Sequence, residues 1–108
     1  MSITENKKIA NKYIASVLNQ QNLDVLSELA ATNVVAHVAG GDLTGREALS
    51  EHLAQRPVPE SPIRVDHELA DDDRVVLQLS SGDVTTISVF RIQGGQIAEL
   101  WDARIAQA

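Results

Sequence analysis

The sequence contains no cysteine, which excludes disulfide bonds, thiolate metal ligands and a cysteine nucleophile. Aromatic residues are also scarce, at 3% of the chain, so any pocket must be walled mainly by aliphatic side chains. No apolar run approaches the roughly 20 residues that a membrane-spanning helix needs, and the polar start MSITENKK does not resemble an export signal. We therefore expect a cytoplasmic protein with no membrane partner.

Positive charge is in short supply as well. Nine Lys and Arg residues face fifteen Asp and Glu residues, for a formal net charge of −6. Because phosphate backbones are bound by Lys and Arg, we expect no nucleic-acid partner. The 108 residues, 44% of them hydrophobic, suffice for one globular core. We predict a single domain over residues 1–108.

The first half of the sequence shows helical signals. Apolar residues at helical spacing predict a helix over about residues 4–19, and Ser2–Glu5 has the form of a capping box at its start. A second, short helix is expected next, and the β-branched run NVVAHVA predicts a strand. Thr44–Glu47 reads as another capping box and predicts a third helix, which the prolines of RPVPESP end.

The second half changes to the period of two that is typical of strands. Apolar and polar residues alternate over Ile63–Leu69, which predicts a half-buried strand. Turn signals at Asp71–Asp73, Ser81–Asp83 and Gly94–Gly95 then separate three long strands, and their close spacing predicts an antiparallel meander. Helices followed by strands indicate the α+β class.

The strands of this meander carry apolar residues in both phases of the alternation. One phase holds Val75, Leu77, Leu79, Ile87 and Val89, and the other holds Val76, Val84, Phe90 and Ile92. A single antiparallel sheet covered by helices on one side should have one polar face. We therefore predict a homodimer through the sheet, in which a second copy covers the outer face.

Two stretches, VVAHVAGGDLTGREAL and FRIQGGQIAELWD, give the whole pattern a resemblance to the SnoaL-like branch of the NTF2-like superfamily. The resemblance implies a cone in which a curved, mainly antiparallel sheet wraps the N-terminal helices and encloses a pocket. The fold hosts cyclases, isomerases, hydratases, epoxide hydrolases and non-catalytic binders, so it does not by itself assign a function.

A carboxylate near the end of the chain is the most informative candidate. Neighbouring strand residues point to opposite faces, so Asp102 should share a face with Leu100, while Trp101 should share the other with Ile97 and Glu99. A carboxylate on an apolar strip must be protonated, paired or exposed at the rim. Asp102 is thus either a general acid/base with a raised pKa or a solvated residue near a strand end.

An ion pair offers another explanation of Asp102, with Arg91 or Arg104 as its partner. His37 is either a buried histidine satisfied by hydrogen bonds or, as the resemblance implies, a pocket group that orients or shares the proton of Asp102. The resemblance also implies a set of pocket-lining residues: Tyr13, His67, Gln78, Ser88, Phe90 and Leu100.

Two positions depart from the relatives that the sequence resembles. In that branch a His is expected where Gln78 stands, and an Asp where Ser88 stands. Both replacements keep hydrogen bonding but cannot transfer a proton at neutral pH.

No metal and no cofactor are expected. The three His residues lack a metal-ligand spacing, and the sequence has no nucleophile elbow, no Gly-rich dinucleotide turn and no P-loop.

The resemblance and the candidate residues leave several functions open. The first is a cofactor-free isomerase, cyclase or aldol-type enzyme acting on a small apolar carbonyl compound. The alternative is a non-catalytic dimeric binder of a small hydrophobic ligand, and a third possibility is a structural module. An epoxide hydrolase has less support, because its Asp-Arg-Asp cluster could draw only on Asp102 with Arg91 or Arg104.

Overall fold

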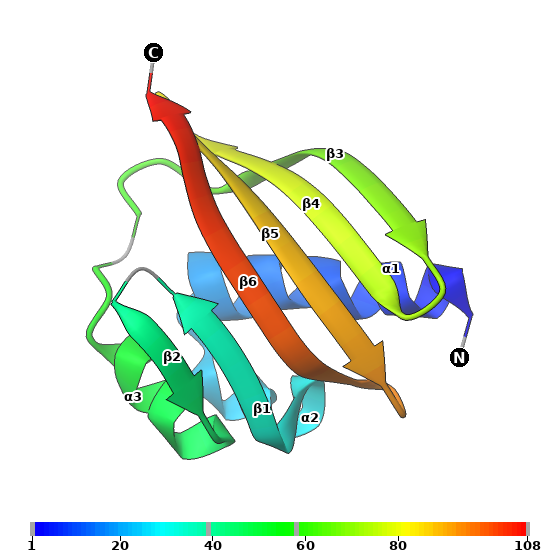
Figure 1. Cartoon of the computed structure of the whole chain (residues 1–108). Helices are drawn as coiled ribbons and strands as arrows, with labels where there is room; N and C mark the ends of the chain where they lie inside the picture. Colours follow the sequence, from blue (N-terminus) through cyan, green and yellow to red (C-terminus); the bar gives the residue numbers. More distant parts are fainter. Residues whose placement is uncertain (1, 39, 58, 108) are drawn as a thin grey trace.

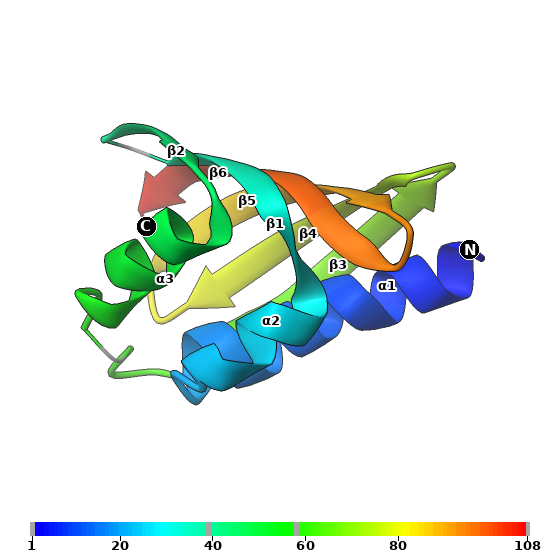
Figure 2. The same ribbon diagram turned by 90° about the horizontal axis from the view of Figure 1, so that it is seen from below.

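The computed structural model describes residues 2–38, 40–57 and 59–107, and for residues 104–107 it describes the backbone alone. Helices lie on one side of a curved six-stranded sheet, and the other side carries no helix in the described part of the chain (Figures 1 and 2). This arrangement confirms the α+β class. No described helix is long and apolar enough to cross a membrane.

The N-terminal helix forms as predicted. Helix α1, Ile3–Lys12, continues without interruption into a π-helical segment, η1, Tyr13–Asn19. Its first turn is capped because the Ser2 hydroxyl accepts a hydrogen bond from the Glu5 amide at 3.1 Å. The remaining helical elements are the 3₁₀ turn η2 (Leu23–Val25), the short helix α2 (Leu26–Leu29) and the helix α3 (Arg46–Ala54).

Helix α3 begins differently from the prediction. Its N-cap is Gly45, which makes no side-chain capping bond, so the capping box predicted at Thr44 is wrong. Thr44 is the last residue of a strand and pairs with Val35. The Gly45 amide then bonds the Val34 carbonyl at 2.7 Å, and the turn into the helix occurs at the Gly45 φ of +98°, a conformation that suits glycine.

The sheet has the strand order β2-β1-β6-β5-β4-β3. Every neighbouring pair is antiparallel except β1 and β6, which run parallel. The strands are β1 (Ala30–Val38), β2 (Gly41–Thr44), β3 (Arg64–Asp71), β4 (Arg74–Ser81), β5 (Val84–Gln93) and β6 (Gln96–Gln107). The C-terminal meander is therefore confirmed, and β6 joins it to the N-terminal hairpin at the centre of the sheet (Figure 1).

Strand register decides which apolar residues face the helices. Val75 pairs with Phe90, and Leu77 pairs with Ser88, so odd positions of β4 and even positions of β5 share the inward face. The inward apolar residues of these two strands are Val75, Leu77, Leu79, Phe90 and Ile92, all buried. The sequence analysis placed Val75 and Val89 in the same phase and therefore on the same face. In the structure Val89 instead pairs with Val76 on the outward face.

An irregularity in β6 changes the expected alternation there. Arg91 pairs with Glu99, but the next residue, Ile92, pairs with Ile97. The extra residue on β6 is a β-bulge, which breaks the alternation of side chains. Ile97 and Leu100 are consequently both buried in the core, and the prediction that Ile97 shares a face with Trp101 is wrong.

One side chain ties the end of η1 to the start of the meander. The Asn19 amide group donates to the Ile63 carbonyl at 3.0 Å and accepts from the Ile63 amide at 2.8 Å. Replacing Asn19 with Ala should lower the free energy of unfolding by about 1–3 kcal/mol, because two backbone groups lose their partner. Urea unfolding measures this loss. Gln20→Ala, at an exposed neighbour, should stay within about 0.5 kcal/mol of wild type, and an equally small loss for Asn19→Ala would contradict the prediction.

Candidate functional site

Asp102 lies on the inward face of β6, directly opposite Ser88 of β5. The Ser88 hydroxyl donates a hydrogen bond to Asp102 Oδ1 at 2.6 Å. Ser88 is almost completely buried, with 1% of its surface exposed, whereas Asp102 as a residue is exposed. The carboxylate therefore sits where the interior of the cone meets water.

The surroundings of Asp102 raise the pKa of its carboxyl group. The loss of water around the carboxylate raises this pKa, while the Ser88 hydrogen bond and the electrostatic influence of Arg56 and His52 oppose the increase. Desolvation is the largest of these effects, so the neutral acid is favoured relative to an ordinary aspartate. A carboxyl group with its pKa moved towards neutrality can both accept and return a proton.

Tyr13 faces the same region from the start of η1. Its ring is buried and contacts the Phe90 ring edge to face, with 5.6 Å between centroids. Burial raises the pKa of the Tyr13 phenol, and the negative charge of Asp102 raises it further, while Arg56 lowers it. The phenol is thus a protonated hydrogen-bond donor close enough to Asp102 to respond to its charge. We call Tyr13, Ser88, Arg56 and Asp102 the Asp102 recess.

The space beside this recess is small. A cavity of about 10 Å³ lies between η1 and α3, lined by Val17, Leu18, Gln21, Leu53, Arg56 and Pro57. That volume holds about one water molecule. The Gln21 side chain donates to the carbonyls of Leu53 and Arg56, at 3.5 and 3.1 Å, and so holds the end of α3 against η1.

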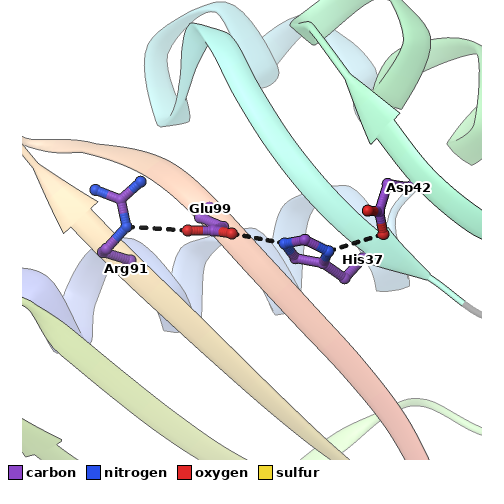
Figure 3. A network of polar contacts seen from close by, with 4 residues as sticks. All are labelled: His37, Asp42, Arg91 and Glu99. Carbon is purple, nitrogen blue, oxygen red and sulfur yellow. Dashed lines mark hydrogen bonds and ion pairs between the residues drawn. The ribbon is translucent and has the colours of Figure 1, made fainter.

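The structure separates His37 from Asp102. His37 pairs with Trp101 across β1 and β6, and its side chain lies on the outward face, on the opposite side of the sheet from Asp102. Its ring nitrogens contact Asp42 and Glu99 instead (Figure 3). The expected proton sharing between His37 and Asp102 therefore has no geometric basis in this fold.

The other predicted lining residues divide between the two faces. Phe90 and Leu100 pair with each other and are buried beside the recess. His67 and Gln78 pair with each other on the outward face, away from the helices. Of the two arginines considered as partners of Asp102, Arg91 bonds Glu99 instead, and the side chain of Arg104 lies outside the described residues.

Two residues that influence Asp102 were not among the predicted site residues. Arg56 and His52 act electrostatically on Asp102 from α3 and the residues just beyond it. The sequence gives no sign of this influence, because the packing of α3 decides it. Glu99 could have been found as the partner of His37, since it shares one face of β6 with Trp101. Within the described residues, no three His, Cys, Asp or Glu side chains gather as metal ligands.

The helices and the curved six-stranded sheet have the NTF2-like fold of small α+β proteins. The chain belongs to the SnoaL-like domain family, whose model matches residues 10–100. No curated protein sequence gives a significant match.

Solved structures agree with this assignment at low sequence identity. A candidate ketosteroid isomerase from Kribbella flavida has a TM-score of 0.79 at 20% identity, over 98% of this chain and 82% of its own. A candidate polyketide cyclase from Sinorhizobium meliloti has a TM-score of 0.77 at 24% identity, over 89% of this chain and 94% of its own. An epoxide hydrolase from M. tuberculosis has a TM-score of 0.77 at 16% identity, over 95% of this chain and 84% of its own. At these identities the likeness shows the fold alone.

Proposed function

We propose that the chain is a cofactor-free acid–base enzyme that acts on a small apolar carbonyl compound, as an isomerase, a cyclase or an aldol-type catalyst. The observation that carries this proposal is the Asp102 carboxyl group, which has a raised pKa and is hydrogen-bonded to a buried hydroxyl on the concave face. Isomerase and cyclase candidates among the similar structures support it at the level of the fold.

Each residue of the Asp102 recess has a role in this chemistry. Asp102 removes a proton from the carbon next to the carbonyl group and returns it to another atom. Ser88 fixes the orientation of the carboxylate through its 2.6 Å bond. The Tyr13 phenol and the positive charge of Arg56 stabilise the negative charge that develops on the carbonyl oxygen. His37 takes no part, since it lies on the other face.

The recess favours a small and largely apolar substrate. The core beside Asp102 and Ser88 consists of buried aliphatic residues and of the edge-to-face pair of Tyr13 and Phe90. The cavity of about 10 Å³ between η1 and α3 is too small for a large ring system.

A non-catalytic binder of a small hydrophobic ligand is the second candidate. The hydrogen bonding of Asp102 favours this binder. Among the described residues only the Ser88 hydroxyl bonds the carboxylate, and a serine hydroxyl does not exchange its proton as an acid or base at neutral pH. Such a binder would hold its ligand in the same recess without converting it.

A second copy of the chain is the proposed partner. The outward face of the sheet carries Leu69, which is 71% exposed, together with Val76, Ile87, Val89 and Trp101, which are partly exposed. Leu69, Val76, Val89 and Trp101 are neighbours across the paired strands, and a patch of exposed apolar side chains supports an interface. Pairing two such faces gives a closed dimer with twofold symmetry.

Proton exchange tests the proposed reaction without knowledge of the natural substrate. Small ketones and aldehydes are incubated with the protein in deuterated buffer, and loss of the proton next to the carbonyl group is followed by ¹H NMR. The proposal expects catalysed exchange for at least one compound. Binding of these compounds without any exchange would support the non-catalytic alternative.

A further inference from the structure

A network of four charged side chains crosses the outward face of the sheet (Figure 3). His37 Nδ1 lies 2.8 Å from Asp42 Oδ1, and His37 Nε2 lies 2.6 Å from Glu99 Oε2. Arg91 Nε donates to the other oxygen of Glu99 at 3.2 Å. The network thus links β2, β1, β6 and β5, and we call it the His37 network.

Both ring nitrogens of His37 face carboxylate oxygens. A neutral imidazole carries a single N–H, so only the doubly protonated ring can donate to both carboxylates at once. The Glu99 bond, followed by the Asp42 bond, raises the pKa of His37, and the same contact with His37 lowers the pKa of Glu99. With its proton the network has two positive and two negative groups; without it, one negative charge remains uncompensated.

The groups around the His37 network place it within the proposed dimer surface. The Trp101 ring stacks on the His37 ring, with 5.2 Å between centroids and an angle of 14°. The Arg74 guanidinium of β4 lies 5.4 Å from the Trp101 ring centroid. Strand β3 adds three titratable groups to this face, Arg64, His67 and Asp71, which pair with Ser80, Gln78 and Arg74 rather than with the network.

We propose that the proton on His37 controls whether the outward face can pair with a second copy of the chain. Burying the network in an interface is tolerable when its charges balance, but it leaves an unpaired carboxylate when His37 is neutral. Breaking a buried ion pair by removing one partner is strongly destabilising. This inference rests on the proposed dimer.

The direction of the pH dependence follows from this linkage. If association buries the carboxylates against His37, the dimer binds the His37 proton more tightly than the monomer does. Association is then strongest below the His37 pKa of the monomer and weakens as the pH rises through the higher pKa of the dimer. The affected range begins at the His37 pKa of the monomer, which already lies above the ordinary histidine value of about 6.5, and extends upward.

Sedimentation equilibrium at constant ionic strength, from about pH 6 to about pH 9, tests the inference across the range where histidine titrates. We expect the dissociation constant of the wild-type dimer to rise at least about tenfold, the equivalent of one pKa unit. His37→Gln should remove this dependence, because its amide has no titrating proton. His67→Gln, which removes a histidine from the same face but outside the network, should retain it.

The possible outcomes separate the inference from the proposals on which it rests. A dimer whose dissociation constant does not change with pH, or a His37→Gln variant that keeps the wild-type dependence, would overturn the control by His37 and leave the dimer intact. A monomer at every pH would overturn both the dimer and its control, without bearing on Asp102. Should His37→Gln fail to fold by circular dichroism, Glu99→Gln replaces it, because it removes the carboxylate that requires the His37 proton and should also flatten the dependence.

Discussion

Replacing Asp102 with Asn is expected to reduce catalysed proton exchange by about 10²- to 10⁴-fold, the range by which a positioned acid or base contributes to catalysis. Asn has nearly the same shape and can still bond the Ser88 hydroxyl, but it cannot take up a proton at neutral pH. Initial exchange rates by ¹H NMR, compared at equal protein concentration, measure the effect. Exchange that survives this substitution would exclude Asp102 as the proton-transfer group.

The stability of Asp102→Asn supplies the control for this experiment. Because the folded-state pKa of Asp102 lies above its ordinary value, the ionised carboxylate is less favourable in the folded protein than in the unfolded chain. The free energy of unfolding of the wild type is therefore higher at low pH, where Asp102 is protonated, and it falls as the pH rises through the raised pKa of Asp102. The Asn variant avoids this loss, so at neutral pH it should be at least as stable as wild type. A variant that unfolds more easily would mean that lost activity reflects lost structure.

Replacing Phe90 with Ala is expected to lower the free energy of unfolding by about 3–5 kcal/mol. Phe90 has no exposed surface, and its ring packs against Tyr13 at the centre of the core. A loss of this size is a large part of the roughly 5–15 kcal/mol that stabilises a typical domain. Urea unfolding followed by circular dichroism measures it.

Phe90→Leu provides the matched comparison, since it keeps most of the apolar volume and should cost less than the Ala variant. If both variants unfold at the wild-type urea concentration, Phe90 does not anchor the core as described. If Phe90→Ala proves too unstable to purify, the Leu variant still tests the direction of the effect.

Much of the fold could be predicted from the sequence because local signals and tertiary packing agree. The apolar stripe of residues 4–19 and the capping box at Ser2 gave the first helix, and the turns after Asp71 and Ser81 gave the meander. The start of α3 was missed because strand pairing holds Thr44. The inward position of Ile97 was not predicted, because it depends on a β-bulge that no sequence pattern indicates.

The candidate site was less predictable, since it depends on which strand faces meet. Ser88 lies opposite Asp102 because of the register between β5 and β6. The sequence of either strand alone does not reveal this register. His37 and Gln78 point away from the helices because His37 pairs with Trp101, and Gln78 pairs with Ile87, on the outward face of the sheet. The contribution of Arg56 depends on the packing of α3, which spacing along the chain does not encode.

The ionisation of the Asp102 carboxyl group tests the central claim most directly, because it requires no substrate. A ¹³C NMR titration of the protein labelled at aspartate carboxyl carbons, assigned with Asp102→Asn, gives its pKa. We predict a value above the ordinary aspartate pKa of about 3.9, and a still higher value in Ser88→Ala, which lacks the hydrogen bond that stabilises the carboxylate. A pKa at or below the ordinary value would show a well-solvated or ion-paired carboxylate and would contradict the role of Asp102 as an acid–base group.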